Sequence, residues 1–174
     1  MKINAKLISA CILGAAILPA AQAQVSKTMG LSVRAGVFFP TNSDARAEGK
    51  NWFIGGADYR LNSGALGGMA GGPVNSISSI SVDYYNKGDF QNLPVLLNVT
   101  TRQNELYYTM GAGIAFAQIP NGSGGRESKN GLAYAVAIGM NFEQGKSPLF
   151  IEGRYYGSSR SELNGFAVML GIRL

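Results

Sequence analysis

The sequence contains no histidine, and Cys11 is its only cysteine. Without histidine the chain cannot build a Ser-His-Asp triad or a metal site with histidine ligands. If the segment that holds Cys11 is removed on export, the mature protein can form neither a disulfide nor a thiolate nucleophile. These absences predict a protein that is not an enzyme and that carries no cofactor or bound metal.

Charge is also scarce. Charged residues make up 14% of the 174-residue chain, whereas about 25% is usual for globular proteins. No run of lysine or arginine is present, so the formal net charge of +5 does not predict nucleic-acid binding. The 24 glycines are about twice the usual share. Few charges and many glycines favour the wall of a β-barrel over a cytosolic enzyme.

Residues 1–23 have the pattern of a cleavable signal peptide. Two lysines precede the apolar run Leu7–Leu18, and an A-x-A cleavage site ends at Ala23. The run is too short to cross a bilayer as a helix. Cys11 imitates the lipidation site of a lipoprotein, but most of the apolar run follows it, which favours cleavage after Ala23. We therefore expect a signal peptide followed by one β-barrel domain over residues 24–174.

The rest of the chain alternates between two kinds of side chain, which is the pattern of β-strands whose faces meet different surroundings. The clearest case is the hairpin from Leu106 to Phe142. Ile77 is out of phase, which predicts a bulge near Ser78 if Ile77 also faces outward. No amphipathic helix is expected after the signal peptide. The predicted strands are 31–39, 52–61, 79–85, 93–101, 106–116, 132–142, 149–156 and 166–174, with loops at 40–51, 86–92, 118–130 and 157–164 and a Gly-rich connection at 62–75.

One parity of all the predicted strands is apolar and carries no charge. A closed barrel of eight strands has an interior just wide enough for side chains, so the apolar rows cannot all point inward while glycine and alanine face water. The apolar parity is therefore expected to face lipid, and the fold class is an all-β, eight-stranded antiparallel up-and-down transmembrane barrel. The other parity, expected to face the lumen, carries Arg34, Asp58, Arg60, Asp83, Glu152, Arg154 and Arg173.

Aromatic residues of the outward parity are expected to form two girdles at the membrane surfaces. If the N-terminus lies in the periplasm, the outer girdle comprises Phe39, Phe53, Tyr84, Phe116, Tyr134, Tyr155 and Phe166. The periplasmic girdle then comprises Tyr59, Tyr108 and Phe142.

On this pattern of strands, residues 28–174 resemble the small eight-stranded outer membrane barrels of Gram-negative bacteria, the outer membrane protein A and X type. The resemblance implies a location in the outer membrane, contact with its lipid and lipopolysaccharide, insertion by the barrel assembly machinery, and a monomer. The chain departs from the family in ending at Leu174, where an aromatic residue is usual, and in the long connection at 62–75.

Function is less well determined by the sequence. We expect a structural or surface-interaction role, with Arg126, Glu127 and Lys129 in the 118–130 loop as candidate contacts for lipopolysaccharide phosphates or a partner. The lumen charges either neutralise one another or line a narrow ion path; an acid–base carboxylate pair is a third reading. The alternatives for the whole protein are therefore a narrow channel and a secreted, soluble, lipocalin-like ligand-binding barrel.

Overall fold

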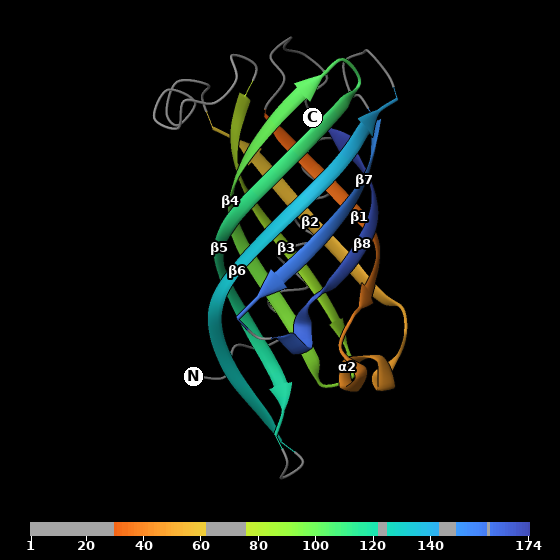
Figure 1. Ribbon diagram of the computed structural model, residues 1–174, viewed down its shortest axis with the longest axis vertical. Helices are drawn as coiled ribbons and strands as arrows, with labels where there is room; N and C mark the ends of the chain where they lie inside the picture. Colours follow the sequence, from red (N-terminus) through yellow and green to blue (C-terminus); the bar gives the residue numbers. More distant parts are fainter. Residues whose placement is uncertain (1–29, 62–75, 122–124, 143–148, 160) are drawn as a thin grey trace, which may run out of the picture.

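A computed structural model describes residues 30–61, 76–121, 125–142, 149–159 and 161–174. The expected signal peptide and the 62–75 connection lie outside these ranges. Figure 1 shows a barrel of tilted strands. In chain order the strands are β1 (Leu31–Pro40), β2 (Trp52–Arg60), β3 (Ser76–Lys87), β4 (Phe90–Gln103), β5 (Leu106–Pro120), β6 (Arg126–Asn141), β7 (Leu149–Ser158) and β8 (Gly165–Arg173).

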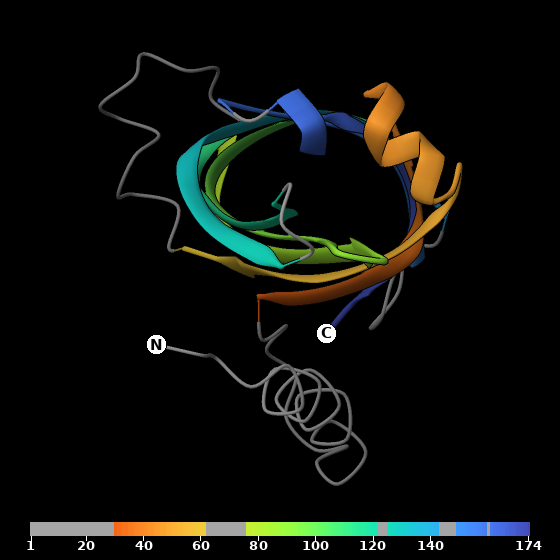
Figure 2. The same cartoon turned by 90° about the horizontal axis from the view of Figure 1, so that it is seen from below.

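Each strand pairs with its neighbours in sequence, and β1 pairs with β8, so the sheet closes on itself (Figure 2). All pairings between the described strands are antiparallel. The predicted fold, an antiparallel up-and-down barrel with eight strands in the described ranges, is confirmed. Closure leaves no sheet edge along the wall, which is required of strands that meet lipid.

The apolar parity faces outward along the whole wall. In the centre of β5, Met110 is 67% exposed, whereas the neighbouring Thr109 is buried. Apart from Ser78, the buried polar and charged side chains, including Arg34, Asp83 and Arg154, lie on the opposite parity. The exposed row comprises Val37, Phe39, Phe53, Tyr59, Ile80, Val82, Leu97, Val99, Leu106, Tyr108, Met110, Ile114, Phe116, Leu132, Tyr134, Val136, Ile138, Leu149, Phe166, Val168 and Leu170.

Ile77 faces inward, so the bulge near Ser78 that an outward-facing Ile77 would require does not form in β3. Ser76 pairs with Thr101 and Val82 with Val95 without a break in register. Ile77 therefore keeps the parity of the lumen residues and lines the interior.

The predicted loops are shorter than expected because the strands extend into them. β3 and β4 leave only Gly88 and Asp89 between them, and β5 and β6 convert most of 118–130 into a paired hairpin. β6 begins at Arg126, so the charged residues assigned to a loop lie on a strand. The sequence shows no alternation near Arg126, because both faces of the hairpin are polar at this end. This end lies beyond the outward apolar row.

The 40–51 segment contains a helix that was not expected, α2 (Ser43–Glu48), and a 3-10 turn, η2 (Ser161–Leu163), interrupts the 157–164 loop. The side chain of Asn42 caps α2 by accepting hydrogen bonds from the backbone N–H groups of Asp44 and Ala45. Ala45 is fully buried, and its side chain anchors the helix over the barrel end. Among the described residues, no helix is long and apolar enough to cross a membrane.

The β1–β8 seam depends on Gly36. A Cβ atom at this position would overlap the backbone carbonyl of Val168 and lie 2.7 Å from the Cα atom of Met169. We expect Gly36→Ala to lower the free energy of unfolding by about 1–3 kcal/mol, because backbone atoms of β8 would have to shift. Urea unfolding measures the change. Gly153→Ala is the control, since its Cβ meets nothing closer than 4.0 Å; equal stability of the two variants would contradict this account of the seam.

Candidate functional site in the barrel lumen

A buried ion cluster crosses the middle of the lumen. Arg34 from β1 donates to both carboxylate oxygens of Asp83 from β3, with Nη2 at 2.8 and 2.9 Å and Nε at 3.0 Å. Arg154 from β7 approaches the same carboxylate at 3.5 Å. Asp83 is fully buried, and the two arginines are 6% and 2% exposed. One carboxylate therefore serves two buried guanidinium groups.

The cluster continues to Glu152. Its Oε1 accepts a 2.8 Å hydrogen bond from Arg154 Nε, and its Oε2 accepts one of 3.0 Å from the hydroxyl of Tyr107. Asp58 lies at the edge of the cluster, 3.9 Å from Arg34 Nη1, and accepts a 3.0 Å hydrogen bond from the hydroxyl of Ser79. All three carboxylates are engaged, as buried charges require. This arrangement leaves no carboxylate of the cluster positioned as a free acid or base.

Aromatic side chains fill the lumen between the ion cluster and α2. Phe38 stacks on Tyr85 with ring centroids 4.1 Å apart, and Trp52 lies 5.5 Å from Phe38. The hydroxyl of Tyr85 donates a 2.9 Å hydrogen bond to the backbone carbonyl of Leu163 in η2. This bond connects the aromatic side chains to the β7–β8 loop. Phe38, Trp52 and Tyr85 are at most 1% exposed. The lumen at the α2 end is a packed core.

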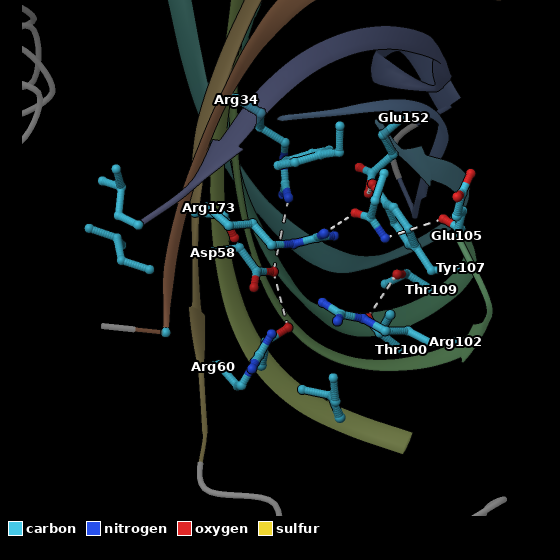
Figure 3. A pocket seen from close by; sticks show the side chains of 18 of the residues that line it. Arg34, Asp58, Arg60, Thr100, Arg102, Glu105, Tyr107, Thr109, Glu152 and Arg173 are labelled. Carbon is cyan, nitrogen blue, oxygen red and sulfur yellow. Dashed lines mark hydrogen bonds and ion pairs between the residues drawn. The ribbon is translucent and has the colours of Figure 1, made fainter. Parts of the chain in front are cut away.

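A cavity of about 570 Å³ occupies the opposite half of the lumen. It extends from the ion cluster to the barrel end where β1 begins and β8 ends. Arg60, Arg102 and Arg173 line its outer part, from β2, β4 and β8 (Figure 3). The Arg173 guanidinium lies over the rings of Phe150 and Tyr107, at 4.8 and 5.1 Å from their centroids, and donates a hydrogen bond to Asn141.

The structure separates the predicted lumen charges into two groups. Arg34, Asp58, Asp83, Glu152 and Arg154 meet in the ion cluster. Arg60 and Arg173 line the cavity, and the expectation that they pair with the acidic residues is wrong: no ion pair joins either one to a carboxylate within the described ranges. Pairing depends on which strands face each other across the lumen, which alternation along a strand does not reveal.

Sequence reasoning missed Arg102 and Tyr107. Arg102 lies between the predicted strands 93–101 and 106–116, but it continues the inward parity of Asn98 and Thr100 on β4. Tyr107 has the inward parity of β5, and its length carries its hydroxyl to Glu152. Extending the alternation of 93–101 by one residue identifies Arg102, and Tyr107 already has inward parity in the predicted strand 106–116.

Apart from Phe142, the predicted girdle residues lie on the outer parity of their strands. Tyr155 packs between Phe166 and Tyr134, with ring centroids 4.9 and 6.3 Å away, at the α2 end. Phe142 lies one residue beyond β6 and also lines the cavity mouth. By strand direction, Phe39, Phe53, Tyr84, Phe116, Tyr134, Tyr155 and Phe166 lie toward the α2 end, and Tyr59, Tyr108 and Phe142 toward the other.

No group of three or more potential metal ligands from His, Cys, Asp and Glu occurs in the part of the chain that the structure describes.

A scan against protein-family models and a search of curated proteins find no match. A search of solved structures finds chains of related shape. One of them is Ail, the attachment invasion locus protein of Yersinia pestis, in complex with the heparin analogue sucrose octasulfate. It shares 19% sequence identity and a TM-score of 0.44, over 82% of this chain and 94% of Ail. The fold assignment rests on the strand pairing of this chain.

Proposed function

We propose that the chain is an integral outer membrane β-barrel with a structural or surface-interaction role and no enzymatic activity. The observation that carries the proposal is the outward apolar belt. Leu132, Tyr134, Val136 and Ile138 are 47–75% exposed on β6, a degree of apolar exposure that a water-soluble wall would not tolerate. A lipid environment accounts for it, because a membrane barrel places its apolar rows outside and its polar rows inside.

The two alternatives fit the structure less well. A soluble ligand-binding barrel has its apolar rows inside, whereas Asp83 and Arg154 are buried in this lumen. A continuous channel needs an open path, whereas Phe38, Trp52 and Tyr85 pack against one another across the lumen at the α2 end. Neither alternative is favoured by an observation of its own.

The β5–β6 hairpin is the part of the barrel that we propose for surface contact. Its outward apolar row stops at Phe116 and Leu132, and Asn130, Ser128 and Arg126 continue it with polar side chains. Arg126 pairs with Asp89, and Lys129 pairs with Glu127, each at 2.9 Å. In the proposed orientation, Arg126 and Lys129 lie beyond the apolar belt and would meet the phosphates of lipopolysaccharide. Exposed ion pairs contribute little stability, so these two cations can exchange their acidic partners at little cost.

Cell fractionation tests the proposal. We expect the protein in the outer membrane fraction, with a gel mobility that changes on heating because the closed barrel resists detergent until it is unfolded. Insertion by the barrel assembly machinery predicts that recovery falls when that machinery is depleted. Recovery as a soluble protein without detergent would overturn the assignment.

Labelling of intact cells tests the orientation. A membrane-impermeant maleimide is expected to label Ser128→Cys on the hairpin and to leave Gln103→Cys unlabelled until the cells are opened. Both positions are exposed and lie at opposite barrel ends. Labelling of Gln103→Cys alone would place the hairpin in the periplasm and remove the surface role.

A further inference from the structure

We propose that the cavity at the end of the barrel opposite α2 binds a small phosphate-bearing anion through Arg60, Arg102 and Arg173. These side chains come from β2, β4 and β8, which are separate positions around the ring, and all three line the same space (Figure 3). The inference concerns the lumen alone, so it does not depend on the surface role proposed above.

None of these three arginines forms an ion pair with a carboxylate of the described residues. Asp83 and Glu152 are engaged by Arg34 and Arg154, and Asp58 by Ser79 and Arg34. Glu105, in the β4–β5 turn, is the other carboxylate of the cavity wall, and it forms no ion pair with a described residue. Like charges gathered at one mouth create a positive potential that attracts an anion.

Arg102 has a buried hydrogen-bond donor that is unsatisfied. Its Nε atom is buried and has no hydrogen-bond partner among the described residues. Arg102 also lies within electrostatic range of Arg173 and Arg60. A buried donor without an acceptor is costly, and an anion in the cavity would supply the acceptor.

Arg173 is held in position before any ligand arrives. The rings of Phe150 and Tyr107 support one face of its guanidinium group, and Asn141 accepts one of its hydrogen bonds. Tyr107 is itself fixed by its hydrogen bond to Glu152. Because the side chain is already ordered, less entropy is lost when it binds a ligand.

The chemistry of the three groups favours phosphate. A guanidinium fork matches the oxygens of a phosphate or carboxylate in a bidentate geometry. Three such groups suit an anion with more than one negative charge, so a phosphate monoester fits better than a carboxylate with a single charge. The cavity volume of about 570 Å³ leaves room for an organic group beside the phosphate.

Calorimetric titration tests the site with the full chain folded in uncharged detergent at low salt. The probes are inorganic phosphate and glycerol 3-phosphate, which distinguish the free ion from an organic ester; binding of either supports the proposal. Arg102→Gln is expected to weaken binding about tenfold, the effect of losing one charge-assisted hydrogen bond. Arg126→Gln is the control, because it removes the same charge from an exposed site at the opposite end. No binding to the unaltered chain, or equal weakening by both variants, would overturn the proposal.

Arginine-specific modification by phenylglyoxal provides a readout that needs no variant. Mass spectrometry of the unaltered folded protein is expected to show that phosphate protects Arg60, Arg102 and Arg173 while Arg126 reacts at an unchanged rate. The same rate at all four arginines with and without phosphate would contradict the site.

Discussion

Replacing Asp83 with asparagine is expected to lower the free energy of unfolding by about 3–5 kcal/mol, the cost of leaving buried charges without their partner. Asp83 is the carboxylate that Arg34 and Arg154 share, and all three side chains are at most 3% exposed. Asparagine keeps the size of the side chain but removes the negative charge. Arg34 would then lose its closest ion pair, and the two buried guanidinium groups would lose the carboxylate that they share.

The measurement is urea unfolding of the barrel in phospholipid vesicles. Trp52 is the single tryptophan and lies buried in the lumen, so its fluorescence reports the loss of the packed interior. Asp89→Asn is the matched control. Its pair with Arg126 is also 2.9 Å long, but the side chains are 56% and 44% exposed, and exposed pairs contribute at most about 1 kcal/mol. A loss for Asp83→Asn no greater than that of the control would mean that the cluster does not hold the barrel together.

The strands could be predicted because their two faces meet different media. Met110 and Val136 face the outside of the wall, while Thr109 and Ala135 face the lumen. This difference in surroundings produces the alternation of side chains in the sequence. The alternation ends near Arg126, because both faces of the hairpin are polar beyond the outward apolar row. α2 gave no signal either, because a helix of six residues with one buried alanine has no measurable period.

The site was harder to predict than the wall. Parity identified Arg34, Asp83 and Arg154 as lumen residues, but their contacts join β1, β3 and β7, which are not neighbours in the sheet. Contacts across a lumen depend on strand tilt and on the lengths of the side chains, and a linear pattern contains neither. The same limit explains why Arg60 and Arg173 were expected to pair and instead line a cavity.

Placing an arginine at Met110 is expected to destabilise the inserted barrel by about 2–4 kcal/mol, the penalty for a cation at the centre of the lipid-facing wall. Met110 is 67% exposed and lies midway along the outward row of β5, between Leu106 and Phe116. The longer side chain has no nearby water to reach from that depth. Folding into phospholipid vesicles, followed by the heat-dependent gel shift, measures the loss.

Gln118→Arg is the control that distinguishes the effect of depth in the membrane from the effect of the added charge itself. Gln118 has the same outward parity on the same strand, one step past Phe116, and is paired with Ser128 in the polar part of the hairpin. An arginine there is expected to change stability by less than about 1 kcal/mol, because the penalty disappears near the membrane surface. If both variants fold equally well into vesicles, the apolar row does not face lipid. If Met110→Arg alone fails, the boundary of the belt lies between these two residues, where the outward row changes from Phe116 to Gln118.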